Sequence, residues 1–307
     1  MHRSCIVPAL MLALMACRRQ HHRPPALWTP PDTATIARSP AGDEIRYGRA
    51  LVMHTARFFG PEGSLAKSAN GMNCQHCHLA AGTAPWGNNF SAAWGTYPKY
   101  RDRSGSVESL EKKINDCFER SLNGRPIDSA GREMQAMVAY MRWLAAKVPR
   151  GERPAGSGIT QLPWQPQAAD PARGKLVYMR LCATCHGPDG EGKKAGAEFQ
   201  YPPLWGQHSF NTGAGIFRIS KMAGYIYNNM PQGTTWQEPV LTINEAWDVA
   251  AWIVSQPRPY KAFPADWPNI RTKPPDHPFG PYADSFSETR HKYGPFGSML
   301  PASSVKP

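Results

Sequence analysis

The motif Cys-x-x-Cys-His occurs twice in this chain of 307 residues, ending at His78 and at His186. Two thiols at this spacing add to the vinyl groups of a porphyrin, and the histidine that follows them binds the iron from one face. A zinc or redox role fits a single motif much better than two copies on similar segments. We therefore predict two covalently attached haem c groups with His78 and His186 as iron ligands. The attaching residues are Cys74, Cys77, Cys182 and Cys185.

The N-terminal residues predict export. The apolar run 5–16 is too short to cross a bilayer and fits the core of a signal peptide. Cys17 follows Ala16 in a pattern that resembles a bacterial lipoprotein signal. Two outcomes remain open, a lipid anchor at Cys17 or ordinary cleavage after Ala16. Either outcome places the mature protein in the periplasm.

The chain carries a net charge of +12, but its basic residues are scattered and do not form runs. This distribution does not indicate a surface for binding nucleic acid. In an exported redox protein, such a charge favours encounter with small anions or with an acidic electron carrier. A basic surface that serves only solubility is the alternative interpretation.

Two segments of the chain repeat the same order of features. Gly48-Arg-Ala-Leu precedes the first motif as Gly174-Lys-Leu-Val precedes the second, with a longer insertion in the first copy. Each copy closes with apolar residues at helical spacing, over 134–144 and 246–253. Thr242 and Glu245 form a capping-box pattern that predicts where the last helix begins. The sequence therefore predicts a duplicated helical domain.

The order helix, haem motif, long loop, helix resembles that of class I cytochromes c. The expected fold is all-α, with two class I cytochrome c domains joined by a Pro/Gly-rich linker and an irregular Pro-rich C-terminal tail. Aromatic residues in the tail argue against disorder, so we expect it to lie across both domains. The predicted ranges are a signal peptide at 1–17, a flexible tether at 18–40, domains at 41–148 and 169–257, a linker at 149–168 and the tail at 258–307.

The second iron ligand of each haem is less directly readable, because axial ligands lie far apart in sequence. Met230 in Asn-Met-Pro is the preferred ligand of the second haem, and Met222 is its rival. Methionine is often core filler, but His/Met coordination is usual in electron-transfer cytochromes and raises the potential. No comparable Met-Pro follows the first haem motif.

Instead, residues 106–124 carry apolar side chains at helical spacing and end in a glycine. Cys117 shares the apolar face of this expected helix, and Lys113 and Arg120 lie within helical reach of its thiol. A cysteine so placed is an iron ligand, a nucleophile or an inert buried thiol. Spacing alone leaves these three roles open.

The segment around Cys117 resembles that of the dihaem thiosulfate dehydrogenases, and the similarity extends over most of the mature chain. The stretches that carry it are 114–125 (Ile-Asn-Asp-Cys-Phe-Glu-Arg-Ser-Leu-Asn-Gly-Arg), 202–206 (Pro-Pro-Leu-Trp-Gly), 229–231 (Asn-Met-Pro) and 292–296 (Lys-Tyr-Gly-Pro-Phe). The resemblance implies that Cys117 is the distal ligand of a catalytic haem and that Arg103, Lys113 and Ser121 face the substrate. Lys113 stands where the family usually has arginine, so bidentate anion binding is expected to be weaker there.

The resemblance further implies oxidation of two thiosulfates to tetrathionate, or the reverse. Electrons are expected to pass from a His/Cys-ligated haem to a His/Met-ligated haem, and on to a small exported cytochrome or high-potential iron-sulfur protein. Because Asn229 precedes Met230 where some members have a ligand-switching lysine, a permanent His186/Met230 pair is expected. The main alternative is a non-catalytic dihaem electron carrier. A dihaem peroxidase requires an open coordination site, which a thiolate ligand would block.

Overall fold

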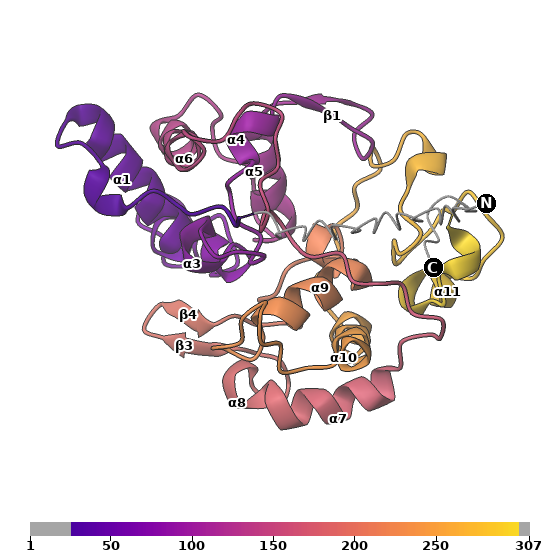
Figure 1. Ribbon diagram of the computed structural model, residues 1–307. Coiled ribbons are helices and arrows are strands. Elements are labelled where there is room, and N and C mark those ends of the chain that lie inside the picture. Colours follow the sequence, from indigo (N-terminus) through magenta and orange to yellow (C-terminus); the bar gives the residue numbers. More distant parts are fainter. Residues whose placement is uncertain (1–25, 301–307) are drawn as a thin grey trace, which may run out of the picture.

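The computed structural model describes residues 26–300. The predicted signal peptide, Cys17 and residues 18–25 of the tether lie outside this range, as does the end of the tail. Helices dominate the described part, and the only strands in it form two short hairpins (Figure 1). None of the helices within 26–300 is long and apolar enough to cross a membrane. The mostly helical fold agrees with the predicted all-α class, although neither hairpin was predicted.

The first helical unit is built on helix α1 (Pro40–Met53) packed against helix α6 (Arg132–Leu144). Gly48 lies at their closest approach, where a Cβ atom would be 1.9 Å from the carbonyl oxygen of Ala136. Leu51 and Met134 are fully buried in the core beside this crossing. Ser39 begins α1 by accepting a hydrogen bond from the amide of Gly42. The repeated glycine therefore permits the two helix backbones to touch.

The second unit repeats this crossing with helix α7 (Pro171–Leu181) and helix α10 (Ile243–Ser255). A Cβ atom on Gly174 would lie 1.9 Å from the carbonyl oxygen of Asp248. Thr242 and Glu245 form both hydrogen bonds of the capping box, so the predicted start of this helix is confirmed. The same close glycine contact in both units supports an origin by duplication.

The remaining elements lie between and beyond these helix pairs. The helix expected over 106–124 is shorter in the structure. Helix α5 (Leu110–Arg120) starts after the N-cap Ser109, so Val107 lies outside it. Val107 lies on strand β2 (Ser106–Glu108), opposite Tyr100 of strand β1 (Lys99–Arg101), and is 67% exposed. The other elements are α2 (Thr55–Phe59), α3 (Leu79–Gly82), α4 (Ala93–Thr96), α8 (Ala183–His186), α9 (Ile219–Asn229), α11 (Glu288–Tyr293), β3 (Lys193–Ala195) and β4 (Glu198–Tyr201), with five short 3-10 segments.

The described tail lies against both units. The Asp266 carboxylate pairs with Arg120 on α5, and the buried Asp276 carboxylate pairs with Arg218 in the second unit. The backbone amide of Ala169 donates to the carbonyl of Tyr293 at 2.9 Å. In Figure 1 the tail, coloured toward yellow, runs beside the elements of both units. Charged contacts, as well as the predicted aromatic ones, hold it there.

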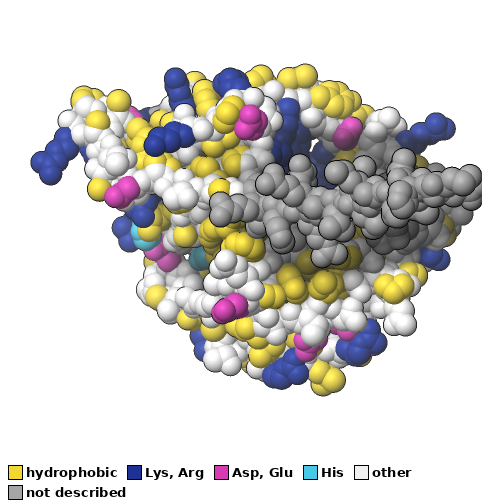
Figure 2. Space-filling view, viewed as in Figure 1, with side chains coloured by type: hydrophobic (Ala, Val, Ile, Leu, Met, Phe, Trp, Pro, Cys, Tyr) yellow, Lys and Arg dark blue, Asp and Glu magenta, His cyan; other side chains and the backbone are white. Residues whose placement is uncertain are grey.

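Basic side chains are dispersed on the face shown in Figure 2, among apolar, acidic and uncharged groups. The net charge of +12 is thus not gathered into one stripe on that face. A denser group of cations lies inside the first unit, around the cavity described next.

Candidate haem sites

The first motif lies on a short 3-10 segment (Cys74–His76) and opens onto a cavity of about 230 Å³. Cys74, Cys77 and His78 all line this cavity. The Nδ1 atom of His78 lies 2.6 Å from the carbonyl oxygen of Asn88. Burial lowers the pKa of His78 to about 4, so the ring is neutral. With Nδ1 engaged by a carbonyl, Nε2 is the nitrogen available to a metal, as is usual for histidine ligands.

Cys117 lines the same cavity from helix α5. Lys113 and Ser121 lie four residues before and after it, which places all three on one helix face, and all three line the cavity. The structure thus brings together the first motif, the predicted distal ligand and two of the three predicted substrate residues. A thiol and an imidazole that share one cavity are a suitable pair of axial donors for a haem iron.

Arg103 is not brought to this cavity. Its Nη1 atom donates to the carbonyl of Gly213 at 3.1 Å, and its Nε atom lies 3.8 Å from the Asp266 carboxylate. Burial, with Arg120 nearby, lowers the pKa of Arg103 to about 10. Arg103 therefore joins the first unit to the second unit and the tail, in contrast to the substrate-facing position that the resemblance implied.

Arg120 also points away from Cys117. Its guanidinium binds Asp266 through two hydrogen bonds and lies 3.7 Å from the centre of the Phe263 ring. Helical spacing predicted that Arg120 lies near the Cys117 thiol. The guanidinium is instead bound by Asp266 of the tail, which that spacing could not reveal.

Three other cations line the cavity and were not among the predicted residues. Lys99 and Arg101 come from strand β1, and Arg153 comes from the segment between the two units. Lys99 and Arg101 are two residues apart, so on a strand they point to the same face. The two-residue spacing could have indicated that Lys99 and Arg101 face the same way, but only if the strand had been predicted, which it was not. Nothing in the local sequence distinguishes Arg153.

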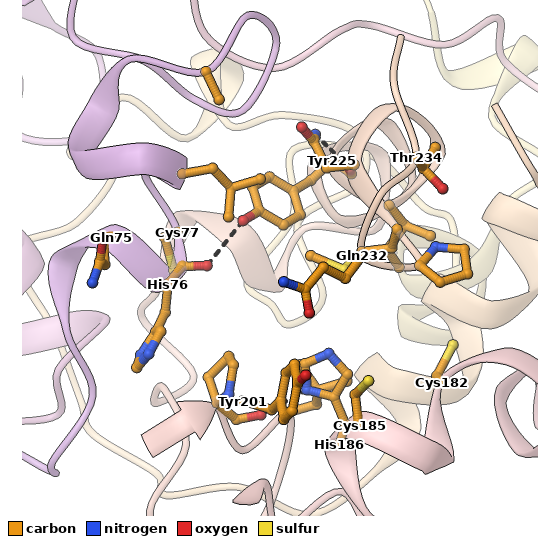
Figure 3. A pocket seen from close by; sticks show the side chains of 18 of the residues that line it. Gln75, His76, Cys77, Cys182, Cys185, His186, Tyr201, Tyr225, Gln232 and Thr234 are labelled. Carbon is orange, nitrogen blue, oxygen red and sulfur yellow. Dashed lines mark hydrogen bonds between the residues drawn. The ribbon is translucent and has the colours of Figure 1, made fainter. Parts of the chain in front are cut away.

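The second motif opens onto a larger cavity of about 990 Å³. The Nδ1 atom of His186 lies 2.8 Å from the carbonyl of Pro202, which repeats the arrangement at His78. Figure 3 shows Cys182, Cys185 and His186 on one side of the cavity and Gln232 and Thr234 on the opposite side. The space between them accommodates a large flat cofactor held by two thiols and one imidazole.

Both candidate methionines line this second cavity. Met222 lies within helix α9 and is 4% exposed, whereas Met230 follows the last residue of that helix and is only partly buried. Asn229 donates to the carbonyl of Tyr225 at 2.8 Å and is held against the helix. Because both methionines line the cavity, Met230 stays the predicted iron ligand and Met222 its rival.

The two cavities meet at the first motif, because Cys77 lines both of them. In Figure 3, His76 and Cys77 border the second cavity, and the hydroxyl of Tyr225 donates to the carbonyl of His76 at 2.9 Å. The Nε2 atom of His76 lies 3.0 Å from the carbonyl of Phe199 and Nδ1 accepts from the amide of Asn73, so both ring nitrogens are engaged. His76 therefore has no ring nitrogen free to bind an iron.

Two helical units, each with a free thiol pair and a histidine held through Nδ1 at a cavity, define a dihaem c-type cytochrome. The chain carries two covalently bound haem c groups. Models of the families "SoxA/TsdA, cytochrome c domain" and "Cytochrome c" match residues 64–149 and 171–257. With 37% identity to thiosulfate dehydrogenases over most of their length, the chain belongs to the thiosulfate dehydrogenase family.

The relatives include the thiosulfate dehydrogenase of Allochromatium vinosum, matched over 83% of this chain and 93% of the relative. That of Stutzerimonas stutzeri is matched over 75% of this chain and 72% of the relative. Among solved structures, thiosulfate dehydrogenase (TsdBA) from Marichromatium purpuratum is similar, with 34% identity and a TM-score of 0.71. This match covers 76% of the present chain and half of the solved one.

Proposed function

We propose that this protein is an enzyme that joins two thiosulfate ions into tetrathionate, or carries out the reverse reduction. The observation that carries the proposal is the position of Cys117, which lines the same cavity as His78 among positively charged side chains. A non-catalytic carrier has no need for a thiol and several cations at one haem. The family relatives named thiosulfate dehydrogenase point to the same substrate.

In this proposal the Cys117 thiolate would hold the iron of the first haem together with His78, and it also acts as the nucleophile. Lys113 and Ser121 hold the sulfonate of the first thiosulfate beside it. The Cys117 thiolate forms a sulfur–sulfur bond to the outer sulfur of thiosulfate, and two electrons leave. A second thiosulfate attacks that sulfur and breaks its bond to Cys117, which releases tetrathionate and regenerates the thiolate. Each haem, when bound, would supply a one-electron acceptor for this two-electron oxidation.

The route of the electrons follows from the two cavities. Cys77, which would attach the first haem, also lines the second cavity, so the two attachment cavities adjoin. We assign Met230 as the distal ligand opposite His186. Because thiolate ligation by Cys117 would lower the potential of the first haem and methionine ligation would raise that of the second, electron transfer from the first to the second would be favoured.

The electron acceptor and the location belong to the same proposal. Export to the periplasm follows from the signal-like segment 5–16, and the partner is a small exported cytochrome or a high-potential iron-sulfur protein. A lipid anchor at Cys17 is decided by the mass of the mature N-terminus. An unmodified Cys17 would end the anchor proposal and leave the periplasmic assignment intact.

The test mixes purified holoprotein with thiosulfate and ferricyanide and measures bleaching of the acceptor and formation of tetrathionate. Cys117→Gly is assayed in parallel, with haem content measured in both proteins. We expect turnover in the wild type and its loss in the variant, with both haems still attached. Full activity of Cys117→Gly would discard the role of Cys117. Absence of turnover in both directions in the wild type would leave a non-catalytic electron carrier.

A further inference from the structure

The side chains that line the cavity at Cys117 include four cations. Lys99, Arg101, Lys113 and Arg153 line it, and among its described lining residues there is no aspartate or glutamate. The nearest acidic partner of this group is the buried Glu108, whose Oε2 atom lies 3.9 Å from Nε of Arg101. Burial, together with repulsion from Arg153, Arg101 and Lys113, lowers the pKa of Lys99 to about 8. Cations held together in this way favour a bound anion.

These cations come from different parts of the chain. Lys113 lies on helix α5 beside Cys117, whereas Lys99 and Arg101 lie on strand β1. Arg153 belongs to the connecting segment, outside both ranges matched by the family models. One cation of the cavity, Lys113, therefore lies on the same helix as the nucleophile Cys117. The other three lie on strand β1 and on the connecting segment.

The strand side is held in place before any anion binds. The Lys99 ammonium lies 4.5 Å from the centre of the Tyr97 ring, and an Arg101 Nη1 donates to the Tyr97 hydroxyl at 3.2 Å. Arg150 in turn donates to the backbone carbonyl of Tyr97 at 3.1 Å. Fixed cations lose little side-chain entropy on binding, so this arrangement is suited to recognising an anion.

The segment that carries Arg153 is likewise fixed to the first unit. The amide of Gly151 donates to Gly95 at 2.9 Å, and the Asn89 side chain donates to the carbonyl of Gly156 at 2.7 Å. Ser157 bonds to Ser91 through their hydroxyls at 2.8 Å. The predicted linker is therefore part of the wall of the first cavity, and Arg153 stands exposed at that wall.

The proposed reaction brings two dianions together, and their repulsion must be offset. After the first thiosulfate is bonded to Cys117, the second must approach the outer sulfur from the side opposite the Cys117 sulfur, because displacement at sulfur is in line. Lys113 is on the helix of the leaving thiolate. Cations from another element are needed where the second dianion approaches.

We propose that Lys99, Arg101 and Arg153 form a second anion subsite, which holds the attacking thiosulfate and then one sulfonate of tetrathionate. This inference rests on the proposed function and divides its substrate site in two. The helix side, with Lys113 and Ser121, holds the thiosulfate bonded to Cys117. No bond to the second subsite is covalent, and the atoms and electrons of the reaction are unchanged.

The test uses full-length holoprotein with Lys99→Gln and Arg153→Gln, and with Lys147→Gln as a control. Lys147 is an exposed cation that does not line the cavity, so its replacement makes the same charge change elsewhere. The first step is followed by stopped-flow haem reduction on mixing with thiosulfate. The second is followed by the intact mass of protein quenched during turnover, which reveals a thiosulfonate group on Cys117.

We expect unchanged first-step rates in both variants, accumulation of the modified Cys117, and an apparent KM for thiosulfate raised at least about tenfold. Lys99→Arg and Arg153→Lys should restore most of the loss, since they retain the charge. Variants that behave like Lys147→Gln would overturn the second subsite. An equal loss in the first step would also overturn it, because the cations would then serve the first thiosulfate. A wild type without turnover of thiosulfate or tetrathionate in either direction would instead refute the proposed function, and the subsite with it.

Discussion

The guanidinium of Arg120 and the carboxylate of Asp266 are joined by two hydrogen bonds of 2.7 Å each. Arg120 lies three residues after Cys117 on helix α5, and Asp266 lies in the C-terminal tail. The Arg103 Nε atom lies 3.8 Å from the same carboxylate. One carboxylate of the tail thus pairs with two buried arginines, and Asp116 on α5 lies 3.8 Å from Nε of Arg120 as a further acidic neighbour. These contacts hold the helix that bears the proposed nucleophile.

Asp266→Asn should destabilise the protein by about 3 kcal/mol, because it removes the two-hydrogen-bond carboxylate partner of the buried Arg120 and leaves only Asp116 at 3.8 Å. The side chain of Arg120 is 9% exposed, so solvent screens it little. The free energy of unfolding in urea checks this. Glu44→Gln, which breaks the exposed pair with Arg132, serves as the control and should change stability far less. Equal effects of the two substitutions would contradict the buried-pair argument.

Gly174→Ala should cost about 1–3 kcal/mol, since the added methyl group meets the Asp248 carbonyl at 1.9 Å and forces α7 and α10 apart. Gly48→Ala should act in the same way in the first unit, against Ala136. Gly215→Ala is the matched control, because nothing lies within 4 Å of its added carbon. Thermal unfolding followed by circular dichroism measures the three variants. A control as damaging as Gly174→Ala would remove the packing explanation.

The kcat/KM for thiosulfate should decrease as pH rises through about 8. Lys99 attracts an anion only when protonated, and its pKa is lowered to about 8 by burial and by Arg153, Arg101 and Lys113, while Glu108 raises it. A group that binds its ligand in the protonated form gives full affinity below its free pKa and loses affinity above it. Thiosulfate itself stays doubly charged throughout this range.

Lys99→Arg is the control for this pH dependence. Arginine keeps its charge at higher pH, so the decrease should move upward in the variant. The measurement is the pH profile of kcat/KM from pH 6 to about 10 for both proteins. Superimposable profiles would show that Lys99 does not titrate in the free enzyme.

Met230→Leu should lower the reduction potential of the second haem and abolish the near-infrared band of methionine-ligated ferric haem, because it removes the thioether. Met222→Leu should leave both unchanged and cost less than about 1.5 kcal/mol, since the two side chains are similar in volume. Spectroelectrochemistry of both variants checks this. The opposite pattern would assign Met222 as the ligand.

Local sequence patterns determined the haem attachment, the helices at the ends of the two units and the functional face of α5. The Cys-x-x-Cys-His motif places all the haem-attaching groups within five consecutive residues. The capping box of Thr242 and Glu245 is a contact across one helical turn. Cys117, Lys113 and Ser121 share a face because four residues make about one turn. Such features depend on neighbours in the chain, so the sequence was enough to predict them.

Tertiary structure decided which charges meet. Arg103 and Arg120 were predicted near Cys117, but Asp266, more than a hundred residues away in sequence, binds them outside the cavity. Arg153 reaches the cavity only because its segment is bonded to the first unit. A buried charge takes the partner that the whole fold supplies, since desolvation makes an unpaired charge costly. No local pattern encodes that partner, and so the sequence alone identified Lys113 but not Lys99, Arg101 and Arg153 among the cations of the substrate cavity.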